Sequence, residues 1–180
     1  YFIVQKTMPL QNFSYVVPGI LAGCAAPTED QFRELVRQRT TTDTAGDTVP
    51  TFRTVIDLRE HSYDTSTREF LTSVAEETGI LHMVHIPLED FAAPPEEAMR
   101  AVSDIVCDAA RQPVLIHCRA GIGRTGVMLA AGVIGLCKTE DALRHVISNV
   151  AADEKGSHVI PYIKQFRKGS LEVPVQANAV

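Results

Sequence analysis

One stretch of the sequence combines a cysteine, an arginine and closely spaced glycines directly after an apolar run. Residues 114–126 read Val-Leu-Ile-His-Cys-Arg-Ala-Gly-Ile-Gly-Arg-Thr-Gly. The apolar start predicts a short buried strand, and the apolar residues from Gly126 onward predict a buried helix. Backbone N–H groups at a helix start lack partners within the helix, and Gly121 and Gly123 permit the turns that gather such groups. The stretch therefore predicts a loop that binds a tetrahedral oxyanion such as phosphate.

Two side chains give this loop its predicted chemistry. Cys118 is expected at the floor of a ring of N–H dipoles near a helix start, an environment that favours the thiolate form of a cysteine. Arg124 stays charged, and its planar fork can hold two oxygens of a phosphoryl group in transfer. We therefore predict a thiolate nucleophile beside a phosphate clamp. Phosphate contacts are expected from the whole loop: Arg119, Ala120, Gly121, Ile122, Gly123 and Arg124.

Cleavage of a phosphate ester also needs an acid, because the leaving oxygen must be protonated. Asp90 is the candidate, since it lies in a loop, residues 87–95, that follows a predicted strand and precedes a predicted helix. The neighbouring Glu89 is the competing candidate. The alternative for Asp90 is a solvated loop carboxylate without a role in the chemistry.

Strands and helices alternate along the chain around these loops. Apolar and β-branched runs predict strands at 54–58, 82–86 and 113–117, and residues 12–23 predict two short strands around a Pro18-Gly19 turn at a sheet edge. Amphipathic helices are predicted between and after these strands. The alternation predicts an α/β fold with a central, mostly parallel sheet flanked by helices on both faces, and it places the Cys118 loop at the carboxyl end of a strand.

Capping patterns mark where several of these helices start. Thr28 with Gln31, and Ser66 with Glu69, have the form of a capping box. Pro95 suits the first turn of the helix that precedes the Cys118 strand.

The length of 180 residues suits one domain with a sizeable core. We predict a single catalytic domain over residues 1–170 and a loose tail over residues 171–180. Residues 40–50 are rich in Thr, Asp and Gly without an apolar period, and they are expected to form a mobile surface loop.

The charge and composition of the chain bear on which partners and which cellular compartment we expect. A net charge of −5 gives no electrostatic reason to expect nucleic acid, and no basic block indicates a membrane surface. The apolar run 126–137 is too short to span a bilayer, so no stable membrane insertion is expected. Four widely spaced cysteines fit a reducing compartment, which predicts a cytoplasmic protein and leaves the nucleus open.

No cofactor and no metal site are expected. His82 and His85 are three residues apart on a predicted strand and so should point to opposite faces. His117, directly before the cysteine, is expected to brace the loop by hydrogen bonds rather than to transfer protons.

The pattern of His117-Cys118, five residues and then Arg124-Thr125-Gly126 resembles the signature of the cysteine-based protein tyrosine phosphatase superfamily. Residues 12–27 resemble the amino-terminal segment of the small atypical dual-specificity phosphatases of the VHZ kind. The strand end at residues 58–60, the acid loop and the phosphate loop follow in the same order as in those enzymes. Two departures are residues 40–50, which look like an insertion, and residues 154–157, where the family tends to have Arg-Pro-Gly-Ser.

The resemblance implies roles for two further positions. The acid loop of these phosphatases has an Asp followed within a few residues by proline, which implies that Asp90 is the general acid. The hydroxyl of Thr125 would donate a hydrogen bond to the cysteine sulfur and ease departure of the thiolate. As an N-terminal helix residue, Thr125 could instead only cap the helix.

Three functions are compatible with these residues. The first is a protein phosphatase that acts on phosphotyrosine, and on phosphoserine or phosphothreonine, through a cysteinyl-phosphate, with a phosphoprotein as its partner. The second is a phosphoinositide or inositol polyphosphate phosphatase, and the third is a non-catalytic phosphate-binding module. The positive charge of Arg119 favours polyanionic substrates. Against them stands Ile122, where related lipid phosphatases carry a second basic residue.

Overall fold

The strand that carries Cys118 lies at the centre of a five-stranded sheet. In this computed structural model the described residues are 10–32, 40–42, 48–50, 52–78, 82–171 and 178–179. Across the sheet the strands run in the order β1 (Ser14–Val17), β2 (Leu21–Ala25), β7 (Val114–Cys118), β5 (Thr54–Asp57) and β6 (His82–His85).

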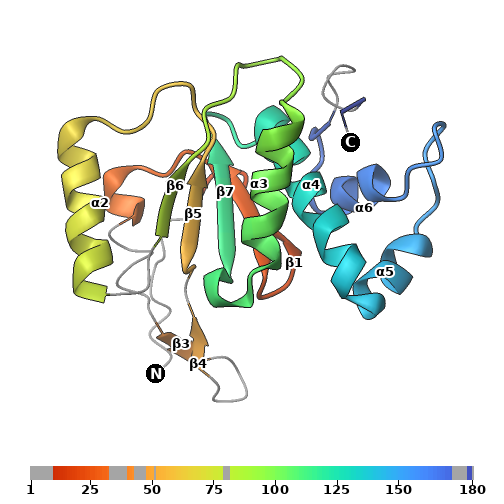
Figure 1. The fold of residues 1–180 in the computed structure, drawn as a ribbon, viewed down its shortest axis with the longest axis horizontal. Coiled ribbons are helices and arrows are strands. Elements are labelled where there is room, and N and C mark those ends of the chain that lie inside the picture. The colour runs from red at the N-terminus through yellow and green to blue at the C-terminus, as the bar shows by residue number, and fades with distance from the viewer. Residues whose placement is uncertain are drawn as a thin grey trace, which may run out of the picture.

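The sheet is mostly parallel, as the sequence predicts. β7 pairs in parallel with β2 on one side and with β5 on the other, and β6 pairs in parallel with β5. β1 is the exception, because a tight turn joins it to β2 as an antiparallel edge strand. The loops that follow β5, β6 and β7 consequently emerge at one end of the sheet, the upper end in Figure 1.

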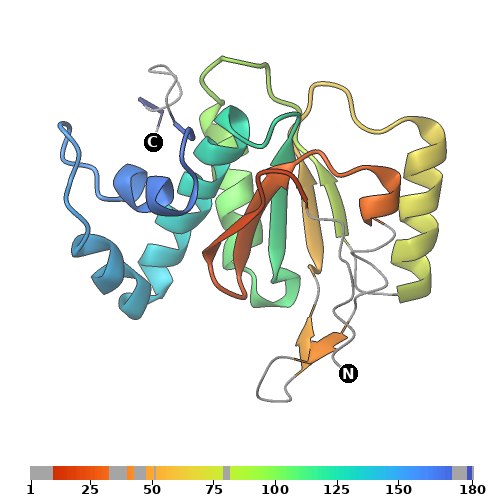
Figure 2. The same ribbon diagram turned by 180° about the vertical axis from the view of Figure 1, so that it is seen from behind.

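Helices cover both faces of this sheet. α2 (Thr65–Thr78) lies on one face of the sheet, and the layer that runs from α3 (Glu96–Cys107) to α6 (Val159–Phe166) lies on the other face (Figures 1 and 2). α4 follows the Cys118 loop and packs against β2, β7 and α3. The helices are α2 (Thr65–Thr78), α3 (Glu96–Cys107), the short 3-10 helix η1 (Ala109–Arg111), α4 (Gly123–Thr139), α5 (Asp141–Ser148) and α6 (Val159–Phe166).

The alternation of side chains along β7 builds a separate apolar core on each face. Ile116 points into the larger core, which includes α3, α4 and α6 residues, whereas Leu115 belongs to the smaller core with Phe32 and Leu71. Both β7 residues are fully buried. A strand buried on both faces reads as a continuous apolar run, which is why residues 114–116 are recognisable from the sequence.

Residues 40–50 depart from the predicted loop. β3 (Thr40–Thr42) and β4 (Thr48–Pro50) pair as a two-stranded antiparallel sheet, while residues 43–47 lie outside the described residues. β-branched threonines favour the extended backbone even where no apolar alternation signals a strand. This pair projects from the end of the main sheet that lies away from the Cys118 loop (Figure 1).

Two helix starts and the predicted tail can be compared with the sequence. The capping box of Thr28 and Gln31 is formed, with hydrogen bonds of 2.8 and 3.3 Å in the two directions. α2 starts at Thr65, and the carboxylate of the preceding Asp64 accepts hydrogen bonds from the Thr67 N–H and the Ser66 hydroxyl, so the predicted Ser66 cap is wrong. Leu171, assigned to the tail from sequence, is buried in the core. Residues 172–177 and 180 of that tail lie outside the described residues.

Within the described part of the chain, no helix combines the length and the apolar character needed to cross a membrane.

Candidate active site

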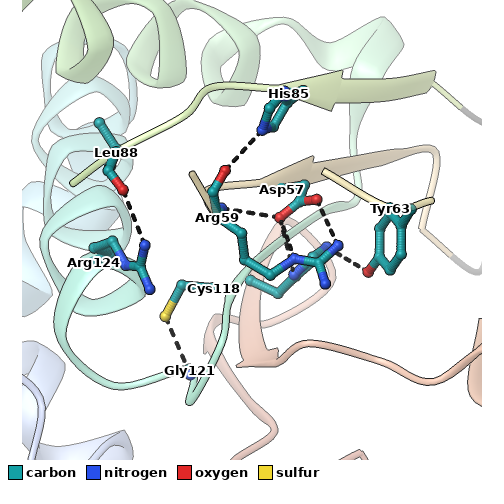
Figure 3. Close-up of polar contacts among 9 residues, drawn as sticks. Asp57, Arg59, Tyr63, His85, Leu88, Cys118, Gly121 and Arg124 are labelled. Atoms are coloured by element: carbon teal, nitrogen blue, oxygen red, sulfur yellow. Dashed lines mark hydrogen bonds and ion pairs between the residues drawn. The ribbon is translucent and has the colours of Figure 1, made fainter. Parts of the chain in front are cut away.

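The loop between β7 and α4 surrounds the Cys118 sulfur. Cys118 ends β7, is 3% exposed, and its sulfur accepts a hydrogen bond of 3.2 Å from the Gly121 N–H (Figure 3). α4 begins at Gly123, and the first N–H groups of a helix have no carbonyl partner within it. The nucleophile candidate therefore lies where backbone dipoles are available to an anion.

Gly121 has a backbone conformation that this loop requires. Its φ is +71°, in the left-handed region that favours glycine. A Cβ at this position would lie 2.3 Å from the carbonyl carbon of Cys24 in β2. The loop thus passes so close to the neighbouring strand that a side chain does not fit.

Arg124 is held from outside the loop and keeps part of its guanidinium unpaired. The side chain is 5% exposed, and its Nη1 donates a hydrogen bond of 2.9 Å to the Leu88 carbonyl (Figure 3). Its Nε is buried and has no hydrogen-bond partner among the described residues. Nη2 lies 3.3 Å from Oδ2 of Asp90. The edge formed by Nε and Nη2 is the one with which an arginine binds two oxygens of a phosphate.

Asp90 reaches the same place from the loop after β6. Its side chain is 45% exposed and faces Arg124, and its N–H donates a hydrogen bond of 3.2 Å to Oε1 of Glu60. That Glu60 carboxylate lies 3.9 Å from Nη1 of Arg124. Glu89, the competing acid, makes no hydrogen bond or ion pair among the described residues. The structure therefore brings Asp90, and not Glu89, to the phosphate clamp.

His117 lies beneath the loop in a buried polar network. It is fully buried, and its Nε2 lies 3.1 Å from the Tyr63 hydroxyl. Burial is the main reason why the pKa of His117 falls to about 4, so the ring is neutral at pH 7. The neutral ring contacts the Tyr63 hydroxyl, and its expected hydrogen bonds to the loop stay a prediction.

Asp57 and Arg59 form the charged part of this network. Arg59 donates side-chain hydrogen bonds of 3.0 and 2.9 Å to the Asp57 carboxylate, and its guanidinium stacks 4.0 Å from the centre of the Tyr63 ring (Figure 3). Burial acts to raise the pKa of Asp57, but the hydrogen bonds from Arg59 and the nearby His117 outweigh it and leave that pKa below its ordinary value. Asp57 is the register partner of His117 in the pairing of β5 with β7, so this ion pair lies at the end of β5 that is next to the loop.

The other predicted loop residues line the rim. Arg119 and Ala120 are exposed, Ile122 is 39% exposed, and Gly123 is half-buried. Thr125 is fully buried, and its hydroxyl has no hydrogen-bond partner among the described residues. The sulfur contact that the family resemblance implies for Thr125 is therefore not formed here.

The histidines of β6 do not form a metal site in the part of the chain that is described. His85 donates a hydrogen bond of 2.7 Å from Nε2 to the Arg59 carbonyl. Among the described residues, no group of three or more His, Cys, Asp or Glu side chains is placed to hold a metal ion.

Two residues that contact the loop were missed by the sequence analysis. Nδ2 of Asn12 donates a hydrogen bond of 2.8 Å to the Ala120 carbonyl, and Nη2 of Arg167 donates one to the Gly121 carbonyl. Burial lowers the pKa of Arg167, while Cys24 and Cys118 act to raise it. In the sequence, Arg167 looks like a cation at the end of a helix, where it would complement the helix dipole. No local pattern links either residue to the loop.

The arrangement has the parts needed for phosphoryl transfer to sulfur. A buried sulfur accepts a backbone hydrogen bond, an arginine has an unpaired buried Nε, and a partly exposed carboxylate lies 3.3 Å from Nη2 of that arginine. Groups of these three kinds are able to act as a nucleophile, an anion clamp and a proton donor.

Comparison with known proteins agrees with this geometry. Residues 47–156 match a family described as "DSP-PTPase phosphatase fused to NAD+ Kinase". A curated relative, "Probable NAD kinase 2, chloroplastic" of Oryza sativa subsp. japonica, is 30% identical over 110 residues. The match covers 60% of this chain but only 11% of the rice protein, so the chain spans about a tenth of that relative's length.

Two solved structures share the fold. Tk-PTP in its active form superposes with a TM-score of 0.59 at 22% identity, covering 93% of this chain and 92% of that one. The core catalytic domain of the PP-IP phosphatase SIW14 from S. cerevisiae gives a TM-score of 0.56 at 20% identity, covering 93% and 91%.

Proposed function

Because the chain belongs to the family of DSP-PTPase phosphatases fused to NAD+ kinase, we propose that it hydrolyses phosphate monoesters of proteins through a cysteinyl-phosphate on Cys118. Phosphotyrosine is the preferred group, with phosphoserine and phosphothreonine as further substrates. The observation that carries the proposal is the meeting of Asp90 and Arg124 at 3.3 Å beside the loop that cradles the Cys118 sulfur.

The first half of the reaction transfers the phosphoryl group to the enzyme. The Cys118 thiolate attacks phosphorus in line, so that an S–P bond forms while the P–O bond to the leaving group breaks. Asp90 gives its proton to the departing oxygen. Arg124 binds two of the three remaining oxygens through Nε and Nη2, and the Leu88 carbonyl keeps its Nη1 in place.

The second half returns the enzyme to its starting state. A water molecule attacks the phosphorus of the cysteinyl-phosphate and gives a proton to the Asp90 carboxylate, now acting as a base. The S–P bond breaks, the sulfur leaves as a thiolate, and inorganic phosphate is released. Asp90 is again protonated, as the next cycle requires.

The negative charges at the rim of the site favour phosphoprotein substrates over phosphoinositides and inositol polyphosphates. Glu60 and Asp90 place two partly exposed carboxylates beside Arg124, and Glu89 adds a third exposed carboxylate to the same loop. Like charges repel a substrate that carries several phosphates. Arg119 and Arg124 are the basic residues of the segment from Cys118 to Arg124, so once Arg124 holds the reacting phosphate only Arg119 remains in this segment for a second one.

The family match favours a second candidate substrate. The family description joins this type of phosphatase to an NAD+ kinase, an enzyme that adds a phosphate to NAD+. The phosphorylated dinucleotide NADP+ is itself a phosphate monoester with one group of the size that the loop accepts. A phosphatase of this type could therefore act on the product of such a kinase.

A substrate panel tests the proposal. Phosphate release is measured on phosphotyrosine, phosphoserine and phosphothreonine peptides, NADP+, phosphoinositides and inositol polyphosphates, with Cys118→Ser as the blank. We expect the highest kcat/KM on phosphotyrosine peptides. A higher value for NADP+ would move the assignment to the second candidate. The protein assignment would be overturned if kcat/KM for phosphoinositides exceeded that for every peptide and if Arg119→Ser lost this phosphoinositide activity. If no substrate released phosphate, the chain would be assigned as a non-catalytic phosphate-binding module.

A further inference from the structure

Three consecutive carbonyls of the phosphate-binding loop accept hydrogen bonds from residues outside the loop. Their donors come from the start of the chain and from the end of α6, far away in sequence. The pairs are Arg119 with the Ala26 N–H at 3.2 Å, Ala120 with Nδ2 of Asn12 at 2.8 Å, and Gly121 with Nη2 of Arg167. All three carbonyls are thus satisfied from outside the ring that surrounds the Cys118 sulfur.

The orientation of these carbonyls determines where the loop N–H groups point. In a trans peptide the C=O of one residue and the N–H of the next point in opposite directions. Outward carbonyls at Arg119, Ala120 and Gly121 therefore turn the following N–H groups inward. Gly121 agrees with this, because its N–H follows the Ala120 carbonyl and donates to the Cys118 sulfur.

Arg167 and Asn12 are themselves tied together. Nη1 of Arg167 donates hydrogen bonds of 2.8 Å each to the Asn12 carbonyl, the Ser14 hydroxyl and the Gly23 carbonyl. The Arg167 side chain is 6% exposed, and its four acceptors fix the plane of the guanidinium. The buried guanidinium of Arg167 thus connects β1 and β2 to the phosphate-binding loop, and it also contacts Asn12, which donates to the neighbouring Ala120 carbonyl.

We propose that Arg167 and Asn12 are positioning residues for catalysis, which hold the Gly121 and Ala120 carbonyls outward and so aim the loop N–H groups at the phosphate. The inference rests on the proposed function, because it concerns the same site. Both residues lie outside the family match at 47–156, so residues from either side of the matched stretch complete its anion site. Neither residue touches the substrate in this scheme.

Three variants and one control test the proposal. Arg167→Met removes the donors, Arg167→Lys keeps the charge without the fork, and Asn12→Gly removes one amide while allowing the φ of +51° at this position. Tyr162→Phe is the control, because it removes a buried 2.6 Å hydrogen bond from α6 to the Val16 carbonyl without touching the loop. For each protein, vanadate affinity is measured by calorimetry, together with kcat, KM and Tm.

We expect Arg167→Met to weaken vanadate binding by about tenfold to hundredfold, the factor that corresponds to a lost hydrogen bond from a charged group. Arg167→Lys and Asn12→Gly should lie between it and the native protein. In all three, kcat should fall more than KM rises, because the loop donors bind the transition state most strongly. Tyr162→Phe should lower Tm and leave vanadate affinity native.

Native vanadate affinity in Asn12→Gly and Arg167→Lys would overturn the proposal. So would an equal loss of affinity in Tyr162→Phe at the same Tm, because it would assign the effect to general loosening. Asn12 is exposed, so its variant can be tested even if Arg167→Met does not fold. Vanadate binding needs no turnover, so a native chain that binds vanadate but hydrolyses no monoester would overturn the proposed function alone.

Discussion

Asp90 and Arg124 come from two different loops, and the structure places Oδ2 of the one 3.3 Å from Nη2 of the other. The loops meet because β6 and β7 are parallel strands of one sheet, so that both carboxyl ends lie at the same edge. The Leu88 carbonyl fixes this relationship from the backbone, since it accepts a hydrogen bond from Nη1 of Arg124 two residues before the acid. The carboxylate and the guanidinium are thus brought together by loops from two different strands.

Replacing Asp90 by alanine should lower kcat on phosphoserine or phosphothreonine peptides by about 10²–10⁴, the usual contribution of a positioned acid. Aryl esters with good leaving groups should lose less, because their oxygen needs little protonation. Steady-state kinetics on both ester types measure the difference. Glu89→Ala is the matched control, and a larger loss there than in Asp90→Ala would assign the acid to Glu89.

Changing Cys118 to serine should abolish turnover and preserve phosphate binding. A hydroxyl is a far weaker nucleophile than a thiolate, whereas Arg124 and the loop amides remain in place. Calorimetry with inorganic phosphate and a phosphate-release assay give the two readouts. Substantial hydrolysis by this variant would exclude a cysteinyl-phosphate.

Replacing Gly121 by alanine should damage the loop more than the same change at Gly156. Both glycines have a positive φ, of +71° and +82°, which costs an L-residue roughly 1–2 kcal/mol. Gly121 alone also meets backbone at 2.3 Å, and overpacking of this kind adds about 1–3 kcal/mol, whereas nothing lies within 4 Å of a Cβ at Gly156. Denaturant unfolding and vanadate binding should separate the two variants. Equal losses would contradict the close approach of the loop to β2.

The stability of the protein should fall as the pH is lowered from about 6.5 to about 4. His117 has its pKa lowered from 6.5 to about 4 in the folded protein, mainly by burial, so in this range the unfolded chain binds a proton that the native state does not. The free energy of unfolding therefore decreases with decreasing pH, by about 3 kcal/mol at most at 1.36 kcal/mol per unit. Urea unfolding across this range measures the slope. His117→Asn should flatten it, and an unchanged slope would show that other groups are responsible.

Local sequence was sufficient for the Cys118 loop because its strand, glycines, cysteine and arginine are consecutive. The position of the Asp90 loop was predictable for a similar reason, since Asp90 follows a recognisable strand and precedes a proline-led helix, while its role as the acid stays a prediction. Asn12 and Arg167 were not predictable, because each acts on a loop carbonyl far along the chain and contact of that kind leaves no periodic pattern. The strands at 40–42 and 48–50 were missed because Thr-Thr-Thr and Thr-Val-Pro contain β-branched residues but are too short to show apolar alternation.

The start of α2 shows a limit of motif matching. Ser66 with Glu69 fits a capping box, but Asp64 two residues earlier accepts the hydrogen bonds that a cap receives. Several polar residues in a row can each begin a helix, and only the tertiary position of the first turn decides among them.

The Cys118 strand and the Asp90 loop differ in how much of the fold must unfold before each of them moves. β7 is hydrogen-bonded to a strand on each side, so its amides should exchange with solvent only when the whole sheet unfolds. Asp90 is held at the rim by exposed hydrogen bonds, from its own N–H to Glu60 and from the Phe91 N–H to Oδ1, and by its ion pair with Arg124, contacts that a local fluctuation can break. On warming, general-acid catalysis should therefore fail before anion binding does. An enzyme that still holds vanadate but no longer cleaves alkyl esters would then mark a partly opened state, well below the temperature at which its β7 amides begin to exchange.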